Sequence, residues 1–209
     1  MKIALFGAGG MIGSRIAQEA LGRGHEVTAV VRTPGKLALK HERLKEVTGD
    51  ASDAASVARV TAGQDAVISA ISIADQEGLL RATAAQISGV KQSGAPRLLV
   101  VGGAGSLEVA PGLELVDAPD FPAAYKPPAL AHREVLKEYR KTDHLDWTYL
   151  SPAAVISPGE RTGKFRLGGD QLVADAKGDS KISAEDYAVA MIDEVEKPRH
   201  IRQRFTLAY

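Results

Sequence analysis

Four glycines, Gly7, Gly9, Gly10 and Gly13, separate a short apolar segment from an amphipathic one near the start of the chain. Their G-x-x-G-x-x-G spacing departs from the strict G-x-G-x-x-G pattern, because Ile12 stands in the place of the third glycine. Glycine permits a tight turn and a close approach of the backbone to a phosphate, and a helix N-terminus attracts anions. We therefore predict a pyrophosphate site of a dinucleotide, formed by Gly7, Gly9, Gly10, Met11, Ile12 and Gly13.

Arg32 indicates which dinucleotide this site would bind. It follows the second apolar segment, Glu26–Val31, where a dinucleotide-binding domain contacts the adenosine ribose. An acidic residue there would accept from the 2′-hydroxyl of NAD, whereas a guanidinium binds a 2′-phosphate with two donors. Thr33 and Lys36 lie close by in the sequence, and Arg15, early in the first helix, is expected close to the phosphates. The sequence favours NADP(H) over NAD(H); the alternative is that Arg32 is a solvated residue at a strand end.

Further candidates follow the next apolar segments, because the carboxyl ends of parallel strands meet at one edge of a sheet. Asp50 follows the third segment and could accept from the adenine amino group, or act as a turn residue or helix cap. The remaining residues that we expect beside the dinucleotide are Ser69, Ala70, Ile71, Gly102 and Gly103.

Short apolar segments alternate with helical patterns along most of the chain, which predicts an α/β fold: a Rossmann-type doubly wound parallel sheet with helices on both faces. The expected strands are Lys2–Phe6, Glu26–Val31, Leu44–Thr48, Asp65–Ile71, Pro96–Val101, Asp146–Ser151 and Arg204–Tyr209. Three of the expected helices begin after the glycine turn, after Asp53 and after Ser183, and the last of these has a Ser183–Asp186 capping box. The other three are Glu77–Val90, Ala129–Lys141 and a short helix within Lys36–Leu44.

The 209 residues suit a single domain, in which residues 1–151 form the cofactor-binding core and residues 152–209 a substrate-side elaboration with a closing helix and strand. The proline-rich segment Leu107–Pro128 has no clean period. It is either a functional loop or lid, or a plain surface connection.

Composition excludes several other classes of protein. The chain has no cysteine, which excludes disulfides, thiolate catalysis and thiolate metal sites. Its five histidines show no chelating spacing, so we expect no metal. The 26 basic and 26 acidic residues balance, and no apolar run is long enough to span a membrane. We expect a cytoplasmic monomer or homodimer that binds neither nucleic acid nor membrane.

The chain resembles the atypical short-chain dehydrogenase/reductase superfamily in its NAD(P)H-binding, NmrA-like branch, nearest the flavin reductase and biliverdin-IXβ reductase group. The resemblance spans nearly the whole sequence. The segments that carry it are FGAGGMIG, VVRTPGK, VTGDASD, VVGGAGSL, LDWTYLSPA and KISAEDYAVAMIDEVEKPRHIRQRFTLAY, in this order.

The Tyr-x-x-x-Lys pair of many short-chain dehydrogenases is absent, because no tyrosine is followed by lysine four residues later. The flavin reductase branch also lacks this pair. Reduction of a flavin or quinone needs mainly a hydride donor and a stacked acceptor, since water can protonate the product. The resemblance therefore implies an NADPH-dependent reductase of a small planar acceptor.

Two candidate catalytic residues come from the same resemblance. Ser106 corresponds to the substrate-side serine of the group, and the alternative is a turn residue. His132 is similar to a histidine early in the corresponding helix, and the alternative is a surface histidine. Ala154 stands where the group carries an active-site histidine, which argues against bile-pigment reduction. Tyr125 and Lys126 could border the substrate.

Two other functions remain open. NmrA-like proteins include non-catalytic members that sense NADP(H) and report to a protein partner. An NAD(P)-dependent epimerase or dehydratase is the third possibility, although such enzymes rely on the missing Tyr-x-x-x-Lys pair.

Overall fold

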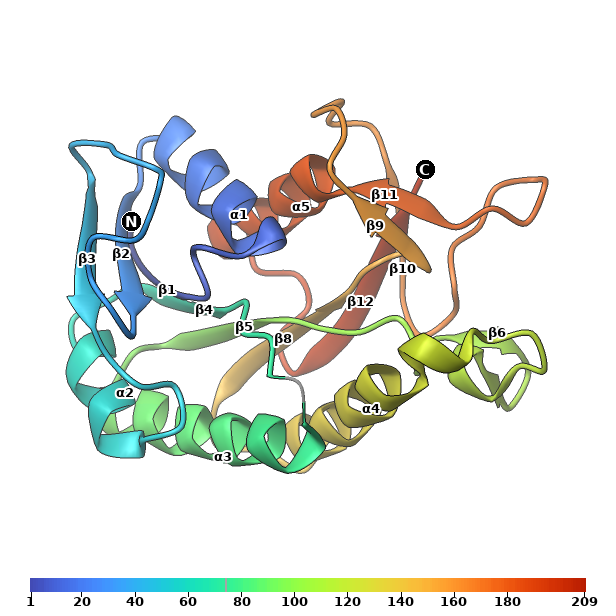
Figure 1. Ribbon diagram of the computed structural model, residues 1–209, viewed down its shortest axis with the longest axis horizontal. Helices are drawn as coiled ribbons and strands as arrows, with labels where there is room; N and C mark the ends of the chain where they lie inside the picture. Colours follow the sequence, from blue (N-terminus) through green and yellow to red (C-terminus); the bar gives the residue numbers. More distant parts are fainter. Residues whose placement is uncertain (74) are drawn as a thin grey trace.

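The computed structural model of the protein describes residues 1–73 and 75–209. Its centre is an eight-stranded sheet in the order β10-β12-β8-β5-β4-β1-β2-β3, with all neighbours parallel except β10 and β12 (Figure 1). The strands are β1 (Lys2–Phe6), β2 (Glu26–Val31), β3 (Leu44–Thr48), β4 (Ala66–Ser69), β5 (Arg97–Val101), β8 (Asp146–Ser151), β10 (Arg166–Gly168) and β12 (Gln203–Ala208). The predicted doubly wound sheet is confirmed.

Helices cover both faces of this sheet. One face carries α1 and α5, which pack on each other, and the other carries α2, α3 and α4 (Figure 1). The helices are α1 (Met11–Gly22), α2 (Ala54–Thr61), α3 (Gln76–Ser93), α4 (Lys126–Arg140) and α5 (Ala184–Glu196). Each face therefore has its own apolar core, one around Ile16, Met191 and Phe205, the other around Val57, Leu98 and Trp147.

The ends of the helices follow from local residue chemistry. Asp53 accepts from the Ala55 N–H at the start of α2, and Asp75 accepts from the Gly78 N–H at the start of α3. Gly94 ends α3 in the left-handed region, at φ 72°. These caps set where each helix starts and stops beside the sheet.

The expected capping box of α5 is only half formed. Ser183 Oγ accepts from the Asp186 N–H at 3.0 Å, but the Ser183 N–H donates to the Tyr209 hydroxyl rather than to Asp186. The Asp186 carboxylate instead accepts from Thr162 Oγ1 at 2.5 Å, the Gly163 N–H at 2.7 Å and the Tyr209 hydroxyl at 2.9 Å. The Asp186 carboxylate thus accepts from residues distant in the sequence and not from the Ser183 N–H.

The prediction of a short helix within Lys36–Leu44 is wrong. This segment forms turns and irregular backbone between β2 and β3. Gly35 before it adopts φ 81°, which a helix cannot continue, and its N–H donates to Glu46 Oε2 of β3 at 2.6 Å. Leu37 is buried, so the segment is held by tertiary packing rather than by helical hydrogen bonds.

The segments that follow β5 form further structure at the edge of the sheet where the carboxyl ends of the parallel strands lie. The proline-rich segment contains β6 (Glu108–Ala110) paired with β7 (Leu113–Glu114), and two 3₁₀ turns, η1 (Leu115–Asp117) and η2 (Ala123–Tyr125). Residues 152–183 contribute the parallel pair β9 (Val155–Ser157) and β11 (Lys181–Ser183). The chain then returns to the central sheet, where β12 lies parallel to β8.

None of the helices in residues 1–73 and 75–209 has both the length and the apolarity that a membrane crossing requires.

Candidate dinucleotide-binding site

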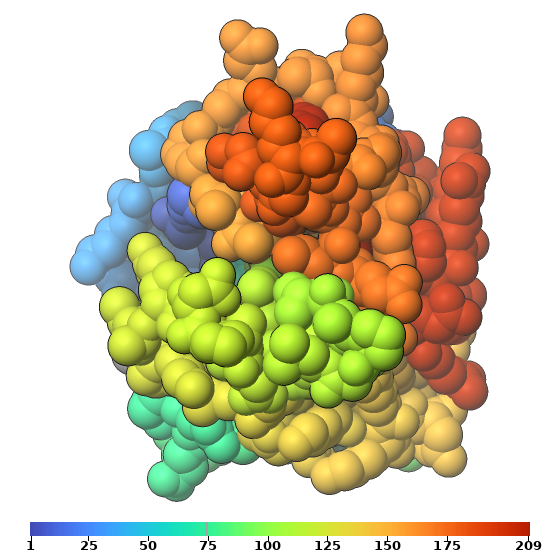
Figure 2. Space-filling view, turned by 90° about the vertical axis from the view of Figure 1, so that its right-hand side faces the viewer, coloured from blue at the N-terminus to red at the C-terminus, as the bar shows by residue number. Residues whose placement is uncertain are grey.

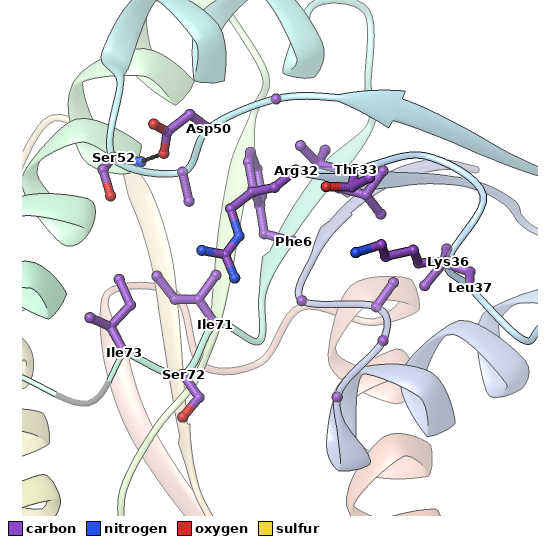
Figure 3. Close-up of a pocket in the computed structure, with 18 residues that line it drawn as sticks. Phe6, Arg32, Thr33, Lys36, Leu37, Asp50, Ser52, Ile71, Ser72 and Ile73 are labelled. Carbon is purple, nitrogen blue, oxygen red and sulfur yellow. Dashed lines mark hydrogen bonds between the residues drawn. The ribbon is translucent and has the colours of Figure 1, made fainter.

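A cavity of about 740 Å³ lies at the carboxyl ends of β1 and β2. It is lined by four segments of the predicted site, which come from the glycine turn and from the ends of β2, β3 and β4 (Figure 3). The lining residues that the sequence predicts are Gly7, Gly9, Gly10, Arg32, Asp50 and Ile71. The structure therefore brings together residues that lie up to 64 positions apart in the chain, from Gly7 to Ile71.

The glycine turn at this cavity leaves no room for a side chain at Gly7 or Gly13. Gly7 adopts φ 82°, and a Cβ on it would lie 2.2 Å from the Ala70 carbonyl oxygen. A Cβ on Gly13 would lie 2.1 Å from the Gly7 carbonyl oxygen, although Gly13 is already within α1. The turn can therefore pack against both β4 and α1 only with glycine at these two positions.

The N-terminus of α1 is open to an anion. Its cap residue is Gly10, no side chain caps it, and its first turn holds no acidic residue. The first N–H groups of a helix lack partners within the helix. Met11, Ile12 and Gly13 therefore present backbone donors and the positive end of the helix dipole beside the cavity.

The charged end of the cavity is formed by Arg32 and Lys36. In Figure 3 the Arg32 guanidinium reaches into the cavity toward Ile71, and the Lys36 ammonium points inward from the segment after β2. Arg32 is exposed and makes no hydrogen bond or ion pair with the part of the chain that the structure describes. Its donors are thus available to a ligand.

Asp50 lies across the cavity from Arg32 but is engaged locally. Its Oδ1 accepts from the Ser52 N–H at 2.8 Å, and its own N–H donates to Ser56 Oγ at 3.0 Å. The Asp50 carboxylate stabilises a turn, which is one of the alternatives predicted for this residue. The cap of α2 is provided by Asp53. None of the described residues donates to Asp50 Oδ2, which a ligand donor can therefore reach.

Two of the residues expected beside the dinucleotide do not line the cavity. Ser69 is buried within β4 between β1 and β5, so it lies behind the cavity wall. Arg15, expected near the phosphates from its position early in α1, donates instead to Glu185 of α5 at 2.9 Å. The same guanidinium also donates from Nη1 to the Met11 carbonyl at 3.1 Å, so Arg15 links the first turn of α1 to α5.

Gly102 and Gly103 form a second group at the end of β5, together with His132 of α4. The Gly102 N–H donates to the Leu150 carbonyl at 2.9 Å, and a Cβ on Gly103 would lie 2.7 Å from the His132 Cβ. Burial lowers the pKa of the His132 imidazole below its ordinary value of 6.5. His132 is therefore neutral at pH 7 and packed directly on the loop that follows β5.

Ser106 lies further along this loop and is buried. Its Oγ and its carbonyl oxygen both accept from Arg204 Nη1 at 3.3 Å. Arg204 also donates to the Asp170 carboxylate, which joins β12 to the segment before β11. Because Arg204 can only donate, the Ser106 hydroxyl proton is not used in this contact.

Several residues of these two groups were not singled out from the sequence. Ser52 and Ile73 line the cavity, and Tyr149 and Arg204 bind the groups around Gly103 and Ser106. The alternation of Trp147 and Tyr149 in β8 signals a buried face, but no sequence pattern signals which backbone group a buried hydroxyl will reach. Only the Ser52 position, two residues after Asp50, could have been found from the turn pattern.

Beyond the cavity, a groove runs between residues 107–128 (green to yellow) and residues 152–181 (orange), with N-terminal residues in blue at its left end (Figure 2). No cluster of three metal-ligating side chains occurs in residues 1–73 or 75–209.

Comparison with known proteins agrees with this geometry. Residues 7–198 match a family described as NAD(P)H-binding. The chain is 51% identical to a candidate exported protein of Burkholderia pseudomallei, with a TM-score of 0.93 and full coverage of both chains. It is 47% identical to a candidate epimerase of Bacteroides thetaiotaomicron, with a TM-score of 0.95 and coverage of 100% and 96%. It is 38% identical to a candidate NADH-flavin reductase of Streptococcus pneumoniae, with a TM-score of 0.86 and coverage of 100% and 99%.

The family match covers the glycine turn, both edges of the cavity and α5, and the expected resemblance is confirmed. The chain belongs to the NAD(P)H-binding family and has a Rossmann-type fold.

Proposed function

We propose that this protein is a reductase that uses NADPH in preference to NADH and transfers a hydride to a flavin- or quinone-like acceptor. The observation that carries the proposal is the pairing of an uncapped α1 N-terminus with an unpaired Arg32 on one cavity. The first fits a pyrophosphate, and the second fits a 2′-phosphate. The relative from Streptococcus pneumoniae, named as a candidate NADH-flavin reductase, supports the reaction class.

When bound, NADPH supplies a hydride, that is two electrons with one hydrogen nucleus, and a proton from water completes the reduction of the acceptor. The α1 N–H groups would hold the pyrophosphate and Arg32 would hold the 2′-phosphate. Gly102 and Gly103 would border the nicotinamide end, with Ser106 and His132 on the acceptor side. Ser106 keeps a free hydroxyl proton with which to bind a carbonyl oxygen of the acceptor.

Buried tyrosines do not supply this proton. Burial raises the pKa of both Tyr149 and Tyr187 well above the ordinary value of 10.0. Both hydroxyls are also occupied by backbone groups. We place the acceptor in the groove of Figure 2, along the segment 107–128, which contains Tyr125 and Lys126.

A non-catalytic NADP(H) sensor is the second candidate, because the chain lacks the Tyr-x-x-x-Lys pair. The relative named as a candidate epimerase favours a third reaction class, but epimerases of the superfamily depend on that same pair. We therefore rank the reductase first.

The test is steady-state oxidation of NADPH and of NADH, followed by absorbance, with FMN, riboflavin and simple quinones as acceptors. We expect turnover that prefers NADPH. Tight NADPH binding without turnover on any acceptor would replace the reductase with the sensor. Conversion of sugar nucleotides with bound NADP, at no net cofactor consumption, would replace it with the epimerase.

A further inference from the structure

The Tyr149 hydroxyl is fully buried and contacts three polar groups at the end of β5. The Gly103 nitrogen lies 3.2 Å from it, the His132 carbonyl oxygen 3.1 Å and His132 Nδ1 3.3 Å. Gly103 and His132 flank the nicotinamide end of the proposed site. One buried oxygen therefore joins the loop after β5 to the first half of α4.

The hydrogens available for these three contacts determine the tautomer of His132. The Gly103 N–H can only donate, and the His132 carbonyl can only accept, so the Tyr149 proton points at that carbonyl. The third contact then has a hydrogen only if His132 Nδ1 carries it. If the ring hydrogen were on Nε2, only the Gly103 N–H and the Tyr149 O–H hydrogens would be available for the three contacts. One contact of the Tyr149 oxygen would then join two acceptors with no hydrogen between them, which is unfavourable in a buried site.

This assignment leaves the lone pair of His132 on Nε2, at the far side of the ring. Nε2 bonds to none of the described residues, and it is not one of the fully buried polar atoms without a partner. Since the imidazole is neutral, Nε2 can accept a hydrogen bond and cannot donate one.

We propose that Tyr149 is a positioning residue that holds His132 as the Nδ1–H tautomer, so that Nε2 accepts from a ring N–H of the hydride acceptor. The proposal rests on the proposed reductase function and narrows its substrate. An oxidised flavin has one ring N–H, at N3 between two carbonyls, whereas a simple quinone has none. The site thus selects a flavin, and His132 binds it without supplying a proton.

The tautomer can be measured without turnover. In protein labelled with ¹⁵N-histidine, with His132→Gln used for assignment, we expect His132 Nδ1 to be protonated and Nε2 unprotonated at pH 7 to 8. Tyr149→Phe should introduce the Nε2–H form. The matched control is Tyr139→Phe, since Tyr139 is equally buried, packs 6.2 Å from Tyr149 between ring centroids, and has a hydroxyl with no partner among the described residues. A protonated Nε2 in the unmodified protein would overturn the proposal.

The ligand is tested with riboflavin and its N3-methyl derivative, which lacks the N–H. We expect KM for the methylated flavin to be roughly 3- to 10-fold higher, the effect of one neutral hydrogen bond. Tyr149→Phe should abolish this difference, whereas Tyr139→Phe should keep it. Equal KM values for both flavins in the unmodified protein would overturn the Nε2 contact. Absence of turnover on every acceptor would instead refute the reductase function, while the tautomer result would still stand.

Discussion

At the scale of single residues, the preference for NADPH that we propose would depend on Arg32. It is exposed, lines the cavity and is unpaired within the described chain, whereas most other arginines of the protein bind carboxylates or carbonyl groups. An arginine held by protein partners would have to give them up to bind phosphate. Arg32 has no such cost, which makes it the main candidate for the 2′-phosphate contact.

Arg32→Asp should weaken NADPH binding by roughly 10- to 100-fold, because it removes a charge-assisted hydrogen bond and adds a repelling carboxylate. NADH binding should change by less. Titration calorimetry with both dinucleotides gives the two affinities. Lys177→Asp, with the same charge change at an exposed turn outside the cavity, is the control. Equal losses for NADPH and NADH would refute the 2′-phosphate assignment.

At the scale of elements, the cofactor site depends on how closely β1, α1 and β4 approach one another. Gly7 and Gly13 lie where backbone meets backbone, so a methyl group has nowhere to go. The two ends of α1 differ in this respect, because a Cβ on Gly22 would meet no atom within 4 Å.

Gly13→Ala should therefore lower the free energy of unfolding by about 1–3 kcal/mol or more, because the turn must shift to accommodate the methyl group. It should also lower NADPH affinity at least tenfold. Gly22→Ala should stabilise the same helix by roughly 0.5–1 kcal/mol and leave NADPH affinity unchanged. Urea unfolding and calorimetry give both quantities. If Gly13→Ala behaved like Gly22→Ala, the glycine turn would not have the close packing described above.

At the scale of the whole molecule, α5 connects the two halves of the chain through carboxylates. Glu185 binds both Arg15 of α1 and the Gly159 N–H, and Glu194 binds Arg97 of β5 at 2.9 Å and His200 Nδ1 at 2.8 Å. The Glu194 side chain is only 3% exposed. These contacts hold the C-terminal segments against the N-terminal half of the chain.

Glu194 makes stability depend on pH. Burial alone would raise the pKa of its carboxyl, but the backbone N–H and ring of His200 and the Arg199 N–H hold that pKa below its ordinary value of 4.5. A depressed pKa in the folded state stabilises the fold above pH 4.5, and this stabilisation is lost as pH falls through the folded pKa.

Glu194→Gln should lower the free energy of unfolding at pH 7 by roughly 3–5 kcal/mol, because Arg97 is left buried without its counter-charge. The difference from the unmodified protein should narrow as pH falls below 4.5. Glu77→Gln, at a side chain 91% exposed, should change stability by less than about 0.5 kcal/mol. Urea unfolding from pH 7 to pH 3.5 measures both variants, and a difference that stayed constant with pH would contradict the linkage.

The local parts of this fold could be predicted because their causes are local. The short segments Lys2–Phe6 and Asp146–Ser151 favour buried strands because they are too short for typical helices, and Gly94 ends α3 by its own backbone freedom. The expected helix within Lys36–Leu44 failed because a weak local pattern competed with Gly35 and the burial of Leu37. The capping box at Ser183 failed in part because the loop before α5 supplied better donors to Asp186.

The sequence by itself determined the parallel sheet, the glycine turn and the place of Arg32 at a strand end, since each depends on neighbouring residues. Only the tertiary structure decided that Arg32 stays unpaired while Arg15 is bound by Glu185. It also decided that one buried hydroxyl, Tyr149, meets both Gly103 and His132. The physical reason is that hydrogen-bond partners are chosen by distance in the folded chain, which spacing in the sequence does not specify.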